Sequence, residues 1–257
     1  MPSTAENALF SARVYEMLPE DQFRQRIGDR WRLFPVDSRL RENLVTGFRA
    51  RVYHNEAMRE LVIAFAGTQL NDWGDWGAIW AMRNGHEPPQ FNDASALYRE
   101  VQRQLEQKGI KTDISFTGHS LGGALAQYMA IRARGCRAET FGAPGILKAL
   151  GRLAGNYDAL YPYPVINHVA RLDAVGDAMG PHLGRTVVHT IDFTDWLPLP
   201  LVDRLLHNHA MKRYLWYFQR TDGAFIRRKI SPAGHVTLEE CNWTGRVRKK
   251  IKRPPGF

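Results

Sequence analysis

The sequence predicts an α/β fold in which helices cover both faces of a mostly parallel central sheet. Strand and helix patterns alternate over residues 114–170, the order that parallel sheets require. Residues 61–66 form a short continuous apolar run, as expected for a strand that is covered on both faces. The chain has 257 residues, 44% of them hydrophobic, which suffices for one sizeable core. We therefore predict one domain over residues 1–243 and a basic tail over residues 244–257.

The first half of the chain adds two helix patterns and one further strand pattern. Apolar and polar residues alternate at helical spacing over about residues 5–18, and with the period of a strand over residues 46–54. Asp93 has the position of an N-cap for a helix that runs to about Lys108, where Gly109 ends it.

The second half alternates regularly between strands and helices. Its predicted elements are a strand at 114–117, a helix at 121–134, a strand at 138–141, a short helix at 146–153, a strand at 165–170 and a final helix at about 201–219. In such sheets the reactive groups lie beyond the carboxyl ends of the strands. We expect the functional residues there.

Most of the net charge of +9 lies at the C-terminal end. Residues 244–257 contain six Lys and Arg residues and no acid, so the rest of the chain carries only +3. A charge cluster of this kind affects which surfaces the protein binds and says little about its fold. It predicts transient contact with an anionic membrane surface. No zinc-ligand set, Walker loop or aromatic RNA-binding strand is present, so we expect no nucleic-acid partner.

The expected compartment of the protein depends on three features: a membrane span, a signal peptide and a disulfide framework. The longest apolar runs fall far below the roughly 18 to 20 residues of a membrane span. The N-terminus has no basic start followed by an apolar stretch, as a signal peptide would. Cys136 and Cys241 form no disulfide framework. We expect a cytoplasmic protein, or one exported without a cleaved signal peptide.

Residues 118–122 read GHSLG, the Gly-x-Ser-x-Gly pattern of a nucleophile elbow. The pattern follows a predicted strand and opens a predicted helix, which is the context that it requires. Because the chain reverses sharply here, Ser120 takes a strained conformation at the apex, and Gly118 and Gly122 leave room for it. The helix N-terminus supplies amides for a developing oxyanion. We predict that Ser120 is the nucleophile and that His119 only packs.

Four segments, in the same order, resemble the class 3 lipases, which are α/β hydrolases. They are TGHSLGG at 117–123, FAGT at 65–68, TFGAP at 140–144 and NHVARLDAV at 167–175. The resemblance spans about residues 46–216. It implies an α/β-hydrolase fold and a serine ester hydrolase of the lipase or phospholipase type that acts through an acyl-enzyme. The chain departs from the family's Asp-x-Val-Pro at Gly176.

A serine nucleophile needs a base, and the base needs an acid that holds its tautomer. In this fold the chain order is Ser, then Asp or Glu, then His. Asp173 lies just past a predicted strand, and Asp177 is the alternative acid. His209 fits the family's spacing of a His a few residues before a Tyr, and His207 is the alternative base. His189, in a strand-like segment, is expected to be structural.

The oxyanion needs two or three hydrogen-bond donors. The amide of Leu121, one residue past the nucleophile, is one of them. By resemblance, Thr68 supplies its amide and its hydroxyl. The segment 69–92 matches the region that carries the lid in the resembled lipases. Its tryptophans share one helical face, which suits either a buried face or a membrane-facing lid: Trp73, Trp76 and Trp80.

Two other functions remain open from the sequence alone. The elbow also permits acyltransferase or peptidase chemistry, and the fold could serve as an inactive binding module. No cofactor and no metal are expected, because the His and Cys positions offer no ligand spacing. The expected partner is a lipid or ester substrate. A secreted phospholipase toxin would also require an inhibitory partner protein.

Overall fold

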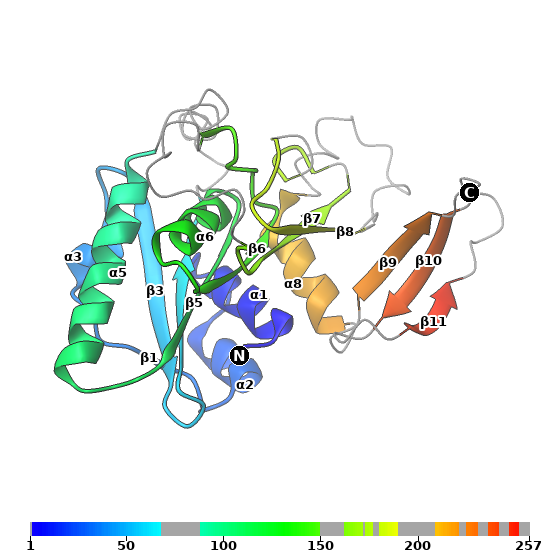
Figure 1. Cartoon of the computed structure of the whole chain (residues 1–257). Coiled ribbons are helices and arrows are strands. Elements are labelled where there is room, and N and C mark those ends of the chain that lie inside the picture. Colours follow the sequence, from blue (N-terminus) through cyan, green and yellow to red (C-terminus); the bar gives the residue numbers. More distant parts are fainter. Residues whose placement is uncertain are drawn as a thin grey trace.

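A central sheet organises the part of the chain that the computed structural model describes (Figure 1). Its strands are β1 (Arg32–Leu33), β2 (Glu42–Asn43), β3 (Phe48–Asn55), β4 (Glu60–Phe65), β5 (Asp113–His119), β6 (Arg137–Phe141), β7 (Val165–Ala170) and β8 (Arg185–His189). The described residues are 2–67, 88–149, 162–171, 173–176, 180–189, 209–220, 225–230, 236–241 and 247–251.

The sheet order is β1-β3-β4-β5-β6-β7-β8, with β2 paired to β3. Strands β4 to β8 are parallel, whereas β1 and β2 pair antiparallel with β3, which pairs antiparallel with β4. The predicted α/β class with a mostly parallel sheet is therefore confirmed. Phe65 faces Gly118 and His119 faces Phe141, so the ends of β4, β5 and β6 meet at one edge of the sheet.

Helices cover both faces of the sheet (Figure 1). They are α1 (Thr4–Arg13), α2 (Glu20–Ile27), α3 (Ser38–Arg41), α5 (Gln90–Gln107), α6 (Leu121–Arg132) and α8 (Met211–Arg220). Alternate residues of β4 belong to different cores: Leu61, Ile63 and Phe65 pack with α5 and α6, and Val62 and Ala64 pack with α1, α2 and α8. Because both faces are covered, every residue of β4 is buried, which explains the continuous apolar sequence of residues 61–65.

Helix α1 begins with a capping box. The Ser3 hydroxyl accepts a hydrogen bond from the amide of Glu6, whose carboxylate accepts from the amide of Ser3. These bonds satisfy two donors that a helix N-terminus leaves unpaired. Residues 6–12 are all buried between the sheet and the neighbouring helices. The N-terminal helix is thus an integral part of the core beneath the sheet.

Helix α5 starts earlier than the sequence predicts. Its N-cap is Pro89, so the prediction of Asp93 as N-cap is wrong. The Asp93 carboxylate instead accepts hydrogen bonds from Asn43 Nδ2 (3.1 Å) and Thr46 Oγ1 (2.6 Å), which fix the turn before β3. A carboxylate in the first turn still favours the helix through its dipole.

The C-terminal part of the chain forms a second, antiparallel sheet of β9 (Phe225–Ile230), β10 (Val236–Cys241) and β11 (Val247–Ile251). Part of the predicted basic tail is therefore a strand. The register of β10 and β11 pairs Glu239 with Lys250 and Glu240 with Lys249. The domain boundary at residue 243 stays a prediction.

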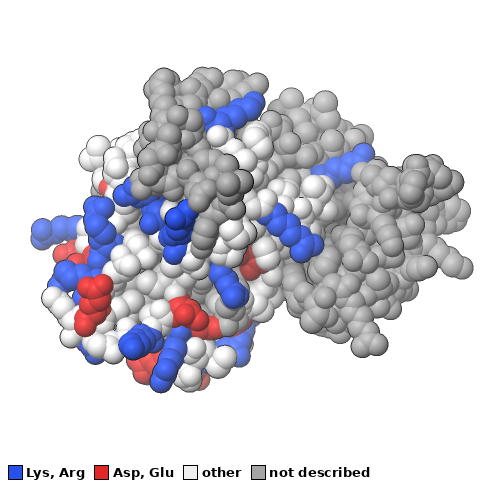
Figure 2. Space-filling model, viewed as in Figure 1, with Lys and Arg blue, Asp and Glu red and all other residues white. Residues whose placement is uncertain are grey.

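The described surface carries both signs of charge, with Lys and Arg beside Asp and Glu (Figure 2). Cys136 is a free thiol. Of the helices that the structure describes, none is long and apolar enough to cross a membrane.

Candidate active site

Ser120 lies at a sharp turn between β5 and α6. Its φ of 56° and ψ of −129° fall in a region that residues with a side chain rarely adopt. The turn is held by hydrogen bonds from Ser120 N to Phe141 O (3.0 Å) and from Gly123 N to Ser120 O (2.9 Å). Strain of this kind costs of order 1–3 kcal/mol, and it persists because the surrounding structure fixes it.

The two glycines of the elbow allow a very close backbone approach. A Cβ atom on Gly122 would lie 2.2 Å from the carbonyl oxygen of Phe65, and one on Gly118 would lie 2.3 Å from that of Gly122. Neither neighbour is a flexible side chain that could move aside. The backbone of α6 is therefore pressed against β4, as the sequence pattern requires.

A continuous hydrogen-bonded chain links Ser120, His209 and Asp173. His209 Nε2 lies 2.8 Å from Ser120 Oγ, and His209 Nδ1 lies 2.9 Å from Asp173 Oδ1. A carboxylate only accepts, so Nδ1 carries the proton and Nε2 is left to accept the proton of the serine hydroxyl. All three residues are at most 2% exposed. The structure thus brings together the three residues that the sequence favours, in the order Ser, Asp, His.

The carboxylate of Asp173 is surrounded by donors. Oδ1 accepts from the amides of Val175 (2.8 Å) and Gly176 (3.0 Å), and Oδ2 accepts from the hydroxyl of Tyr214 (2.9 Å). Burial acts to raise the pKa of Asp173, but His209 and the two amides outweigh it and hold that pKa below its usual value. Gly176 supplies a donor here that a proline could not supply.

Tyr214 completes the support of the acid. Its hydroxyl donates to Asp173 and accepts from the amide of Ala170 at 2.8 Å, which ties α8 to the end of β7. The sequence singled out this tyrosine only by its spacing from His209. Its contact with the acid depends on how α8 packs against β7, which the sequence alone does not give.

Leu121, the first residue of α6, directly follows Ser120. The nitrogen of Leu121 would lie 3.0 Å from a Cβ on Gly67, so the end of β4 lies against this amide. Gly67, which directly precedes Thr68 in the sequence, therefore lies beside the elbow. Several predicted residues lie outside the described residues: Thr68, Trp73, Trp76, Trp80, Asp177 and His207.

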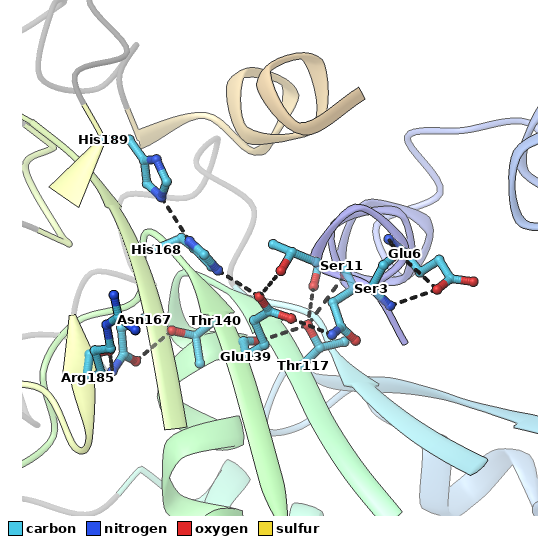
Figure 3. Close-up of polar contacts among 12 residues, drawn as sticks. Ser3, Glu6, Ser11, Thr117, Glu139, Thr140, Asn167, His168, Arg185 and His189 are labelled. Atoms are coloured by element: carbon cyan, nitrogen blue, oxygen red, sulfur yellow. Dashed lines mark hydrogen bonds and ion pairs between the residues drawn. The ribbon is translucent and has the colours of Figure 1, made fainter. Parts of the chain in front are cut away.

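Other histidines that the sequence offers have different partners. Figure 3 shows His189 bonded to His168, and His168 bonded to Glu139, in a buried chain over β6, β7 and β8 (2.8 and 2.7 Å). Glu139 also accepts from Asn7 Nδ2 (2.6 Å), which joins this chain to α1. His189 thus has the kind of buried, hydrogen-bonded setting expected of a structural histidine.

His119 does more than pack, so that part of the sequence prediction is wrong. Both of its ring nitrogens lie within hydrogen-bonding distance of partners, at 3.2 and 2.6 Å. Among the residues that the structure describes, no group of three or more His, Cys, Asp or Glu residues is placed to hold a metal ion.

Comparison with known families and structures identifies similar proteins. A family model described as a Tle-like phospholipase domain matches residues 6–155, more than half of the chain. A search of the curated proteins finds no match.

Solved fungal lipases share the fold at low sequence identity. The propeptide complex of a deletion mutant of Rhizomucor miehei lipase is 16% identical with a TM-score of 0.51, covering 84% of this chain and 77% of that one. Lip2 lipase from Yarrowia lipolytica is 14% identical with a TM-score of 0.49, covering 72% of this chain and 77% of that one. The triacylglyceride lipase of Rhizomucor miehei is 18% identical with a TM-score of 0.49, covering 73% of this chain and 79% of that one.

Proposed function

Because this chain belongs to the Tle-like phospholipase family, and so to the lipase-like α/β hydrolases, we propose that Ser120, His209 and Asp173 catalyse hydrolysis of a lipid ester. The observation that carries the assignment is the buried hydrogen-bonded chain from Ser120 Oγ through His209 to Asp173. It gives a hydroxyl, a base and an acid in the geometry that nucleophilic catalysis needs.

In the first half-reaction His209 Nε2 takes the proton of Ser120 as Oγ attacks the carbonyl carbon of the ester. The resulting oxyanion accepts hydrogen bonds from the amide of Leu121 and, as the resemblance implies, from Thr68. The tetrahedral intermediate collapses, the ester bond breaks, and the alcohol leaves with the proton from His209. Asp173 remains ionised throughout and stabilises the imidazolium.

In the second half-reaction a water molecule takes the place of the alcohol. His209 removes one proton from the water, whose oxygen attacks the acyl carbon bound to Ser120. The second tetrahedral intermediate releases the carboxylic acid, and Ser120 Oγ regains its proton from His209. Each half-reaction therefore returns His209 to its neutral form.

Labelling with a fluorophosphonate probe tests the assignment of the nucleophile. The wild-type protein should be labelled at Ser120, and Ser120→Ala should be neither labelled nor active while keeping its fold by circular dichroism. Loss of a triad member lowers the rate by about four to six orders of magnitude. Substantial turnover by a folded Ser120→Ala protein would exclude this mechanism, and an unlabelled, inert wild type would favour an inactive binding module.

We propose a phospholipid as the substrate, because the matching family model is that of a phospholipase-like domain. A panel of p-nitrophenyl esters, triacylglycerols and phospholipids, with analysis of the products, tests this choice. Release of a fatty acid and a lysophospholipid is the expected result. Transfer of the acyl group to an added alcohol in preference to water would instead indicate an acyltransferase.

We propose that the basic residues after Thr244 hold the enzyme at anionic membranes. Each cation near such a surface contributes about 1 kcal/mol, screened over roughly 8 Å at physiological salt. Deletion of this segment would also remove β11, so the sharper variant replaces Arg248, Lys249 and Lys250 by Gln. It should bind anionic vesicles less tightly, bind neutral vesicles equally, and hydrolyse a soluble short ester at the wild-type rate. Equal binding to anionic vesicles at low salt would refute the proposal.

The compartment and any protein partner are proposals of the same kind. Location in the cytoplasm, or export without a cleaved signal peptide, can be measured by fractionating the producing cells. If the protein is an exported phospholipase, we expect the producing cell to hold an inhibitory partner. The inert Ser120→Ala protein can be used to capture such a partner from the producing cell. The captured protein should then inhibit hydrolysis by the wild type.

A further inference from the structure

The hydroxyl of Tyr15 meets three groups beside the triad. Tyr15 lies just past α1, is 9% exposed, and accepts a hydrogen bond from the amide of Gly67 at 2.6 Å. The same oxygen lies 3.2 Å from His119 Nδ1 and 3.1 Å from the carbonyl oxygen of His119. One phenol therefore joins the end of β4 to the residue that precedes the nucleophile.

The other ring nitrogen of His119 contacts the backbone of the base. His119 Nε2 lies 2.6 Å from the carbonyl oxygen of His209. A carbonyl oxygen only accepts, so Nε2 carries the proton of the neutral ring and Nδ1 is left as an acceptor. The single proton of the Tyr15 hydroxyl donates to the carbonyl oxygen of His119 at 3.1 Å, with Nδ1 as a second acceptor at 3.2 Å. Burial, and then the charge of His209, lowers the pKa of His119 to about 3, which keeps the ring neutral.

These bonds form one chain: the amide of Gly67 to Tyr15, Tyr15 to His119, and His119 to the carbonyl of His209. The rings of His119 and His209 also pack together, with centroids 4.7 Å apart. Gly67 immediately precedes Thr68 and lies against the amide of Leu121. The chain thus runs from the predicted oxyanion-binding segment to the base.

We propose that Tyr15 and His119 are positioning residues that hold the base and the oxyanion-binding segment in fixed positions relative to Ser120. This inference rests on the proposed function of the triad. The His209 carbonyl is fixed by the Nε2 proton of His119, and the Gly67 amide is fixed by the Tyr15 oxygen. Displacement of reacting groups by about 1 Å can lower the rate roughly a hundredfold, so bonds that prevent it have a large effect on turnover.

The test compares variants that remove and restore these bonds. Tyr15→Phe keeps the ring but removes the hydroxyl, and should lower kcat roughly tenfold. His119→Leu removes the donor to His209 and should lower kcat roughly a hundredfold. In His119→Gln the amide nitrogen can take the position of Nε2, so this variant should recover most of the loss. Because the two residues act through one hydrogen-bonded chain, the decrease in kcat of the double variant Tyr15→Phe/His119→Leu should be smaller than the product of the two single-variant decreases.

A matched control separates positioning from simple loss of a buried hydroxyl. Tyr128 in α6 is also buried and stacks on Phe91 with centroids 4.1 Å apart. Tyr128→Phe should leave kcat unchanged. For a soluble ester, KM should stay close to wild type in every variant, because the two residues act on the alignment of reacting groups.

The proton between His209 and Asp173 provides a readout that does not depend on turnover. Its downfield resonance in the proton NMR spectrum should shift or broaden in Tyr15→Phe and His119→Leu, and return in His119→Gln. If His119→Leu does not fold, Tyr15→Phe carries the test, with Tyr128→Phe as its control.

Three outcomes distinguish the inference from the proposed function. An active wild type whose kcat and downfield resonance are unchanged in folded Tyr15→Phe and His119→Gln, and in His119→Leu if it folds, would overturn the positioning role alone. Loss of kcat that His119→Gln does not relieve, with an unchanged resonance, would also overturn it. A wild type that is no more active than Ser120→Ala would overturn the function itself.

Discussion

The hydroxyl of Tyr214 donates a hydrogen bond to Oδ2 of Asp173 over 2.9 Å, on the oxygen that His209 does not use. The acid is therefore held from both sides, by the base at Oδ1 and by α8 at Oδ2. Since the same hydroxyl accepts from the amide of Ala170, Tyr214 also fixes the acid relative to the strand that carries it.

The variant Tyr214→Phe should lower kcat roughly tenfold, because a hydrogen bond to a charged group contributes about 1.5–3 kcal/mol and part of that acts in the transition state. The pKa of Asp173 should rise on loss of this donor. Steady-state kinetics on a soluble ester measures the effect, with Tyr128→Phe as the control. Full activity in a folded Tyr214→Phe protein would show that the two backbone amides suffice to hold the acid.

A substitution that relieves the backbone strain at Ser120 should raise the free energy of unfolding. Ser120→Gly and Ser120→Ala both remove the nucleophile, but only glycine adopts the φ of 56° without a steric cost. We expect Ser120→Gly to exceed Ser120→Ala by about 1 kcal/mol in free energy of unfolding. Urea unfolding of the two inert proteins gives the comparison. A more stable alanine variant would argue against strain at this position.

The choice of base and acid can be checked against the alternatives. His209→Ala should lose about four to six orders of magnitude in kcat, whereas His207→Ala should stay within a few fold of the wild type. Asp173→Asn should lose about four orders of magnitude, because an amide favours the wrong tautomer of His209. Asp177→Asn serves as its control. An inert His207→Ala would reassign the base and leave the mechanism intact.

The hydroxyl of Thr68 should act on the transition state. Thr68→Val retains the amide and the shape of the side chain but loses the second donor. We expect kcat to fall roughly a hundredfold with little change in KM. An unchanged kcat on a soluble ester would mean that backbone amides alone bind the oxyanion.

Buried histidines should make the fold sensitive to mild acid. Burial, and then the charge of His168, holds the pKa of His189 well below its ordinary value of 6.5, and burial lowers that of His119 to about 3. Below pH 6.5 the unfolded chain therefore binds protons that the native state does not, so stability is complete above this pH and falls as the pH drops.

Each such histidine should lower the free energy of unfolding by about 1.4 kcal/mol per pH unit between pH 6 and pH 5. Urea unfolding at pH 7, 6 and 5 measures this slope. The buried carboxyl groups with lowered pKa values, Glu6 and Asp173, contribute only below about pH 4.5, outside this window. A free energy of unfolding that is constant from pH 6.5 to pH 5 would contradict the expectation.

Local patterns in the sequence predicted the parts of the site that local rules govern. The elbow at Ser120 has its own spacing, and a strand buried on both faces, such as β4, must be continuously apolar. The choice of His209 over His207 came instead from the resemblance to the lipases, which implies a His a few residues before a Tyr. These features need only a few neighbouring residues to be recognised.

The predictions that the structure corrected depend on partners far away in the sequence. Asp93 is not a cap because its carboxylate is taken by the turn at Asn43 and Thr46. His119 is not mere packing because Tyr15, more than a hundred residues earlier, supplies its partner. In each case tertiary contacts override a local preference, and one sequence gives no signal of them.

Helices α1 and α8 pack in the same core beneath the sheet, although they come from distant parts of the chain. During translation, α1 and the nucleophile at Ser120 leave the ribosome well before His209 and α8. Until α8 docks on α1, Ser120 has no base and Asp173 lacks the hydroxyl of Tyr214. A nascent chain, or one truncated before His209, is therefore expected to lack the complete triad and to be inactive.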